Sequence, residues 1–242
     1  MVDGAGACDR FELPLGVIGS RYGLDPIAVR RLSILAWLLT HDERAPTSVR
    51  EPALVRDDHL ADALVALELP AVRAASRLVD IGAGAGVPGL PLAAARPDAT
   101  VALVEASGRK CEFMIRAAEL MGLENVEIVH SRAESWQAGI GQLELVTARA
   151  LGPLDVVAEY AAPLLRLGGA LVAWRGRRDP SEEREASRAA AILGLEAHEP
   201  VAVKPYRGAE HRHLVLMTKV AETPQRFPRR AGVARKRPLG RT

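Results

Sequence analysis

Short apolar runs alternate with longer amphipathic stretches through most of the chain. Runs rich in Leu, Val and Ala, each of strand length, occupy residues 78–81, 101–105, 126–130, 143–148 and 170–174. Between them, apolar residues recur every three or four positions, which predicts helices at residues 88–95, 109–121, 154–165 and 181–193. Gly122 and Gly194 stand directly after two of these helices, where glycine commonly ends a helix. The alternation predicts a mostly parallel, doubly wound α/β sheet with helices on both faces.

The two ends of the chain depart from this alternation. Residues 14–39 and 51–69 have helical spacing, and Asp25-Pro26 supplies an N-cap and a first-turn proline. We therefore expect a small helical subdomain before the sheet. Residues 196–203 and 213–219 alternate apolar and polar side chains with no helix between them. This pattern predicts a C-terminal antiparallel hairpin on the otherwise parallel sheet.

The last twenty residues carry seven Arg or Lys and no acid, and three prolines interrupt them. Proline lacks an amide hydrogen and like charges repel, so this pattern argues against a regular core element. We expect an exposed basic tail that lies over the domain. The sequence thus predicts a helical extension at 1–72, a catalytic α/β domain at 73–220 and a basic tail at 221–242.

Composition changes this picture little. The chain has 242 residues, of which 48% are hydrophobic, enough for a sizeable core. The net charge of +2 is too small to indicate a partner by itself. Cys8 and Cys111 are too few for a disulfide framework, so we expect a cytoplasmic protein. No apolar run approaches the ~18 residues of a membrane span, and we expect no membrane contact.

The first predicted strand ends in an acid and leads into a glycine turn, from Asp80 through Gly82, Gly84 and Gly86. Such a strand–glycine–helix junction brings backbone N–H groups close to a nucleotide-like ligand. Residues 84–89 match the dinucleotide pattern G-x-G-x-x-G, but the match begins four residues beyond Asp80, whose charge repels a pyrophosphate. S-adenosylmethionine has no phosphate and carries an ammonium and a cationic sulfur. The loop therefore favours S-adenosylmethionine, and an NAD-dependent dehydrogenase is the weaker alternative.

Two further acids are candidates for nucleoside contacts. Glu105 ends the second predicted strand, where a carboxylate can accept hydrogen bonds from both ribose hydroxyls. The alternative is a solvated acid at the end of a strand. Ala133 and Glu134 follow the third strand, where an adenine pocket is lined, although Glu134 alone is also typical of a helix start. These contacts suit a methyltransferase and an NAD enzyme equally.

Longer motifs narrow the choice to one family. Residues 86–91, Gly-Val-Pro-Gly-Leu-Pro, extend the glycine loop, and residues 147–150, Thr-Ala-Arg-Ala, end the fourth strand. With these motifs and the basic ending, residues 47–239 resemble the small-subunit (16S) ribosomal RNA methyltransferase G family, also called the glucose-inhibited division protein B family. The resemblance implies a Rossmann-like class I fold. It also implies methyl transfer from S-adenosyl-L-methionine to guanine N7 in the decoding-centre loop of 16S rRNA.

The resemblance assigns cofactor contacts to Gly82, Val87, Ala133, Glu134 and Arg149. Guanine N7 already carries a lone pair, so no general base is needed, and catalysis rests on positioning and electrostatics. Arg149 is the predicted catalytic residue, placed near both the methionine end of the cofactor and the target guanine. A salt bridge from Arg149 to the acid that ends the first or second strand is a compatible structural alternative.

The chain departs from the family at Ala45-Pro46-Thr47, where an Asn-Leu-Thr triplet is usual, at Ala63, usually Ser, and at Arg175, often Lys. These changes fall in the substrate pocket. His59 and Asp62 lie one helical turn apart and are candidate substrate contacts, with a structural His–carboxylate pair as the more common alternative.

The arginines that we expect to contact RNA are Arg175, Arg207, Arg212, Arg229 and Arg230. A solvated charge run is the alternative for those in the tail. The expected partner is 16S rRNA or the small ribosomal subunit, and we expect a monomer with no metal. The alternative function is a methyltransferase that acts on a small molecule or a protein.

Overall fold

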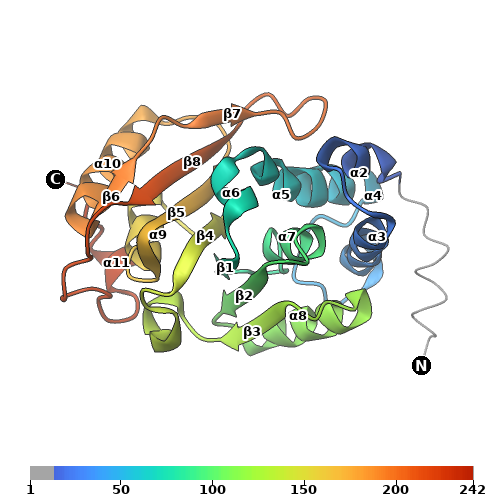
Figure 1. Ribbon diagram of the computed structural model, residues 1–242, viewed down its shortest axis with the longest axis horizontal. Helices are drawn as coiled ribbons and strands as arrows, with labels where there is room; N and C mark the ends of the chain where they lie inside the picture. Colours follow the sequence, from blue (N-terminus) through green and yellow to red (C-terminus); the bar gives the residue numbers. More distant parts are fainter. Residues whose placement is uncertain (1–13, 242) are drawn as a thin grey trace.

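The computed structural model describes residues 14–241. Its centre is one eight-stranded sheet in the order β3-β2-β1-β4-β5-β8-β6, with β7 also paired to β8 (Figure 1). Strands β1 to β5 are parallel, whereas β8 is antiparallel to β5, β6 and β7. The strands are β1 (Arg77–Ile81), β2 (Thr100–Glu105), β3 (Val126–His130), β4 (Leu143–Arg149), β5 (Leu165–Arg175), β6 (Leu195–Ala197), β7 (Val201–Val203) and β8 (Arg212–Lys219). The predicted α/β class is confirmed.

Helices cover both faces of the sheet (Figure 1). The first group is α2 (Gly16–Tyr22), α3 (Pro26–His41), α4 (Pro52–Leu54), η1 (Val55–Ala61), α5 (Asp62–Leu64), η2 (Val65–Glu68), α6 (Pro70–Ala74), α7 (Gly89–Ala95) and α8 (Gly108–Met121). The second group is α9 (Leu154–Ala161), α10 (Pro180–Leu193) and α11 (Val233–Lys236), and two short turns, η3 (Ala133–Ser135) and η4 (Gln137–Gly139), lie between β3 and β4.

Two hydrophobic clusters correspond to the two faces. Because side chains alternate along a strand, Leu78 of β1 packs with the first group of helices, whereas Val79 and Ile81 pack with the second. The helices before β1 belong to the same cluster as α7 and α8, through buried residues such as Leu35 and Leu64. The division at residue 72 remains a prediction.

The N-cap predicted at Asp25 is confirmed. Gly23 has a φ of 63° and ends α2, and Asp25 begins α3 by accepting a hydrogen bond from the backbone N–H of Ala28. The second helical stretch is irregular, because a π-helical turn, η1, separates α4 from α5. Such turns are rare and often occur at functional sites.

Two predicted boundaries are wrong. The helix expected to reach residue 165 ends at Ala161, since Pro163 cannot continue it, and β5 already begins at Leu165. The first strand of the expected hairpin is interrupted before Pro200 into β6 and β7, and both pair with β8. The antiparallel ending itself is confirmed.

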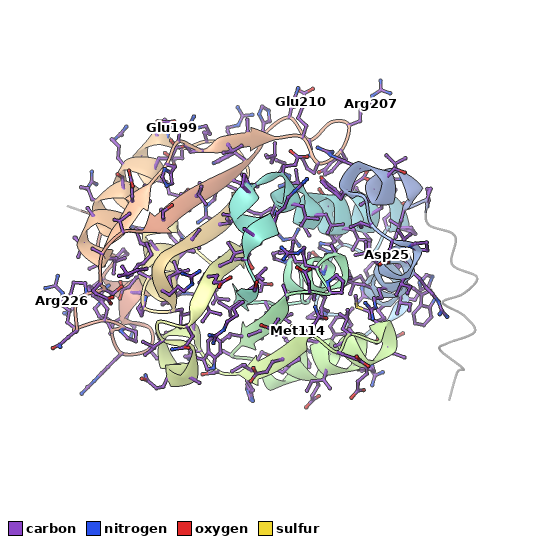
Figure 2. All side chains as sticks on the ribbon, in the orientation of Figure 1. Asp25, Met114, Glu199, Arg207, Glu210 and Arg226 are labelled. Atoms are coloured by element: carbon purple, nitrogen blue, oxygen red, sulfur yellow. The ribbon has the colours of Figure 1, made fainter. Side chains whose placement is uncertain are left out.

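The description of the tail as purely exposed is also wrong. Phe227 and Ala234 are buried in the cluster around α9, and residues 233–236 form the helix α11. The tail does lie over the domain, as expected, because α11 packs against α9. Arg226 points outward (Figure 2), whereas its neighbour Phe227 packs inward.

Candidate active site

The glycine loop lies at the carboxyl end of β1, where the side chain of Asp80 bonds the backbone of Gly89. The Asp80 side chain is almost fully buried; one oxygen accepts a hydrogen bond from Gly89 N at 3.0 Å and the other from Thr147 Oγ1 at 3.1 Å. Burial raises the pKa of Asp80 to about 7, although the Gly89 and Thr147 hydrogen bonds oppose the rise. Asp80 therefore orders the loop through its hydrogen bond with Gly89.

The glycines of this loop are required by its backbone. Gly82, Gly84 and Gly86 all have positive φ angles, 67°, 61° and 79° respectively. A Cβ on Gly82 would collide with Leu151 Cδ1, and a Cβ on Gly86 would approach Leu90 Cδ1 to 2.5 Å. The loop thus has no room for a side chain at Gly82 or Gly86, whereas a Cβ on Gly84 would meet no atom closer than 3.8 Å. The backbone N–H groups of the three glycines donate to Val104 O, Glu105 Oε2 and Ala83 O, which fixes the shape of the turn.

Glu105, at the end of β2, completes the loop. Its Oε2 accepts a hydrogen bond from Gly84 N at 3.0 Å and its Oε1 from Ser107 N at 2.9 Å. The side chain is only 10% exposed, with Lys110 Nζ 4.0 Å away. Glu105 is therefore an ordered acid facing the loop, not the freely solvated acid of the alternative.

A cavity of about 300 Å³ lies above this junction. The residues lining it include four of the predicted cofactor contacts, Gly82, Glu105, Ala133 and Glu134. The other loop contacts, Asp80, Gly84, Gly86 and Val87, do not line the cavity and form the loop beneath it. Its lining, a carboxylate acceptor at a strand end beside a glycine turn, fits an adenosine with a cationic tail.

Arg149, at the end of β4, is held by the π-helical turn. Its Nη1 donates to Asp58 O at 2.7 Å and to Asp62 Oδ2 at 3.1 Å, and its Nη2 donates to His59 Nδ1 at 3.1 Å. The structural alternative, a salt bridge from Arg149 to Asp80 or Glu105, is wrong, because the carboxylate partner of Arg149 is Asp62. The π-turn explains this, since Asp58 and His59 of η1 and Asp62, the first residue of α5, all bond the same guanidinium.

His59 is a neutral positioning group. A guanidinium only donates, so Nδ1 accepts from Arg149, and Nε2 carries the proton that it donates to Thr47 Oγ1 at 2.9 Å. Burial, followed by the charge of Arg149, lowers the pKa of His59 to about 4. His59 and Asp62 share a face, as expected, but they are linked through Arg149 rather than paired with each other.

A second cavity, of about 420 Å³, opens beside Arg149. Its lining residues are Val49, Asp58, His59, Asp62, Arg149, Ala150, Trp174, Arg175, Gly176 and Arg212. Trp174 Nε1 donates to Asp62 O at 2.7 Å, which ties the end of β5 to the helix after the π-turn. Arg175 donates to Gly152 O at 2.6 Å, and burial lowers its pKa.

Asp58 is the accessible acid of the second cavity. Arg212 Nη2 donates to its Oδ1 at 2.9 Å, and the Tyr206 hydroxyl also donates to Oδ1. The side chain remains 30% exposed, whereas that of Asp62 is 5% exposed. Sequence reasoning missed Asp58 and Tyr206. Their signal was weak, because Asp58 is adjacent to His59 but Tyr206 is 148 residues away from Asp58.

Ala150 joins the two cavities. It lines both of them, directly after Arg149, and it has a positive φ of 54°. A non-glycine residue in this conformation is uncommon and marks a constrained turn. The two cavities are therefore adjacent at the carboxyl end of β4, where they share this residue.

The arginines expected to contact RNA differ in their surroundings. Arg175 and Arg212 line the second cavity, and Arg207 is exposed in the loop after β7, where it points away from the body (Figure 2). Arg230 is exposed on the tail, but Arg229 is paired with buried Glu159 of α9. Arg229 therefore anchors the tail, and an RNA contact is not its primary role.

Within residues 14–241, no helix is long and apolar enough to cross a membrane. No group of three or more His, Cys, Asp or Glu side chains within the same range is arranged to hold a metal ion.

The sheet order and the paired cavities at its carboxyl edge define a Rossmann-like, class I methyltransferase fold. The chain belongs to the rRNA small subunit methyltransferase G family, whose model matches residues 36–215. It is 42% identical to ribosomal RNA small subunit methyltransferase G of Chloroflexus aggregans over 84% of this chain and 85% of that protein. It is 41% identical to the protein of the same name from Rubrobacter xylanophilus, over 86% and 84% of the two chains.

One solved structure has a similar fold. It is that of a variant of the 16S rRNA (adenine(1408)-N(1))-methyltransferase of Catenulisporales acidiphilia with cosubstrate SAM. The TM-score is 0.51 at 22% identity, over 64% of this chain and 90% of the other. At this identity the match supports the fold alone.

Proposed function

We propose that this protein transfers a methyl group from S-adenosylmethionine to N7 of a guanine in the decoding-centre loop of 16S rRNA. The observation that carries the proposal is the meeting of the two cavities at Ala150. One cavity suits the adenosine cofactor, and the other suits a flipped-out base. Membership of the methyltransferase G family supplies the class of substrate.

The cofactor supplies an activated methyl group on a cationic sulfur. The residues of the chain then have three tasks. Glu105 accepts hydrogen bonds from the ribose hydroxyls, the loop ordered by Asp80 receives the amino-acid end, and the turn at Ala150 lies where the cofactor and the base meet. Arg149 lies at the boundary, where the remaining N–H groups of its fixed guanidinium orient the bound base by hydrogen bonding.

The second cavity has the polar groups that guanine recognition requires. Guanine presents acceptors at N7 and O6 and donors at N1 and N2. Arg149 and Arg212 supply donors, and Asp58 supplies an accessible carboxylate as acceptor. N7 needs no proton removed before attack, and neutral His59 has both ring nitrogens engaged. The proposed mechanism is therefore positioning without a general base.

The surroundings of the second cavity support an RNA substrate. Arg207 and Arg230 are exposed, so their charges are accessible to phosphates. An NAD-dependent dehydrogenase is disfavoured, because Asp80 already occupies the Gly89 N–H at the start of α7, where a pyrophosphate would bind. The proposal includes a monomeric, cytoplasmic enzyme that acts on 16S rRNA or the small ribosomal subunit.

The decisive experiment incubates the protein with small subunits lacking the modification and with methyl-labelled cofactor, and then maps N7-methylguanine. We expect label at one guanine of the decoding-centre loop. The Arg149→Ala variant should lose at least about 100-fold in rate, by analogy with the loss of other preorganised donors. Arg166→Ala is the matched control, since Arg166 is an exposed β5 arginine that pairs with Glu144. Label on free metabolites or proteins instead, or full activity of Arg149→Ala, would overturn the proposal.

A further inference from the structure

We infer that the C-terminal strap, defined as residues 229–236, closes the adenosine side of the cofactor cavity and that Arg235 is a cofactor-binding residue. The strap is the part of the basic tail that contains α11. The inference depends on the identity of the cofactor and not on the RNA substrate.

The strap bridges two walls of the cavity. Gly232 N donates to Glu134 Oε1 at 3.0 Å, on the wall that follows β3. Arg235 Nη2 donates to Leu151 O at 2.9 Å, on the wall that follows β4. Both Glu134 and Leu151 line the cavity. The strap therefore connects the loops between which an adenosine is bound.

The strap is fixed by contacts outside the cavity. Arg229 Nε donates to Glu159 Oε1 at 2.5 Å, and its Nη2 also bonds Glu159 and the carbonyl of Arg237. Ala234 is only 2% exposed. These anchors lie on either side of Arg235, so its backbone position does not depend on a ligand.

The Arg235 side chain lines the cavity together with Tyr160. Its contact with Leu151 O uses one of the five guanidinium N–H donors, which leaves others for a ligand. Burial raises the pKa of the Tyr160 phenol, and a hydrogen bond from Arg235 opposes this rise. The ring nitrogens N1, N3 and N7 of adenine are acceptors, and its face accepts a stacked guanidinium. A positive side chain is repelled by the cationic sulfur. Arg235 thus suits the adenine end and favours one orientation of the cofactor.

The test measures binding without RNA. Dissociation constants for S-adenosylhomocysteine and for methylthioadenosine, which lacks the amino-acid end, are determined by calorimetry for the native protein and for Arg235→Ala, Arg235→Lys and Lys236→Ala. We expect Arg235→Ala to weaken both ligands by about tenfold, Arg235→Lys by less, and Lys236→Ala to match the native protein. Lys236 is the matched control, because it is exposed on the same helix and does not line the cavity.

Three results would overturn the inference: native affinity in Arg235→Ala, an equal loss in Lys236→Ala, or a loss confined to S-adenosylhomocysteine. Thermal unfolding without ligand checks that the strap remains in place. If Arg235→Ala unfolds at a lower temperature than the native protein, the affinity of Arg235→Lys, which retains the charge, is used instead. Native affinity in Arg235→Lys would then overturn the inference, and a measurable loss would support it. A negative result leaves methyl transfer to RNA untouched, because RNA is absent from every measurement.

Discussion

Asp80 is an acid whose charge state is set by its burial. Its pKa is raised to about 7, so the free protein holds a proton there that an unfolded chain releases near pH 4. This contribution to stability is present below about pH 4 and is lost as the pH rises toward 7. A bound cation lowers the pKa of Asp80, opposite to burial, because it favours the ionised carboxylate.

Cofactor affinity should therefore rise with pH. We expect the dissociation constant of S-adenosylmethionine to fall by up to about eightfold between pH 6 and pH 7.5, the bound for one group with a pKa near 7. Asp80→Asn should show weaker binding and little pH dependence in calorimetric titrations. If Asp80→Asn kept the pH dependence of cofactor affinity of the native protein, the titrating group would be another residue.

A second prediction at the scale of single residues concerns glycine. Gly82 and Gly23 have nearly equal positive φ angles, 67° and 63°, so alanine strains both backbones similarly. Only Gly82 has a neighbour, Leu151, in the path of the added Cβ. Gly82→Ala should abolish detectable cofactor binding, whereas Gly23→Ala should bind normally and lose about 1 kcal/mol of stability. Equal behaviour of the two variants in binding assays would refute the steric argument.

Among the elements, the π-turn η1 decides the geometry of the second cavity. It places the Asp58 carbonyl, His59 and, just after it, Asp62 around one guanidinium. Burial raises the pKa of Asp62, and Arg149 opposes this rise. The element and the arginine therefore stabilise each other, and the positioning of Arg149 depends on residues about 90 positions earlier in the chain.

The tail and α9 form the other informative pair of elements. Glu159 is 3% exposed and its partner Arg229 is 21% exposed, so removing one partner leaves a buried charge. We expect Arg229→Ala to lower the free energy of unfolding by about 3 kcal/mol in urea titrations. Arg230→Ala, at an exposed neighbour, should change it by less than about 0.5 kcal/mol. The double variant Arg229→Met, Glu159→Leu should recover much of the loss, and failure to do so would locate the effect elsewhere.

At the scale of the whole molecule, the two reactants should respond differently to salt. Binding of RNA should weaken steeply as salt rises, because each neutralised phosphate releases counterions, whereas cofactor binding should change little. Arg207→Ala should reduce the slope of log K against log salt by about 0.7 to 0.9. Arg166→Ala, at the opposite end of the strands, is the control. Identical slopes in filter binding would remove Arg207 from the RNA surface.

Much of the fold was predictable from local patterns. The five parallel strands, the N-cap at Asp25 and the glycine loop each follow from residues that are close in sequence. Two boundary errors overlooked local signals, Pro163 after α9 and Pro200 between β6 and β7. The other errors occurred where a tertiary contact outweighed the local pattern. Phe227 and Ala234 pack on α9 in spite of the surrounding charge, and the acid partner of Arg149 lies on a helix in the N-terminal part of the chain.

The sequence by itself determined the class of sheet, the position of the cofactor loop and the family, because these depend on short periods and on motifs of consecutive residues. The tertiary structure alone decided that Arg149 is held by η1, that Ala150 joins two cavities, and that the tail crosses the cofactor cavity. The physical reason is that these contacts join groups about 70 to 150 positions apart. Only the packing of the folded chain brings such groups within hydrogen-bond distance.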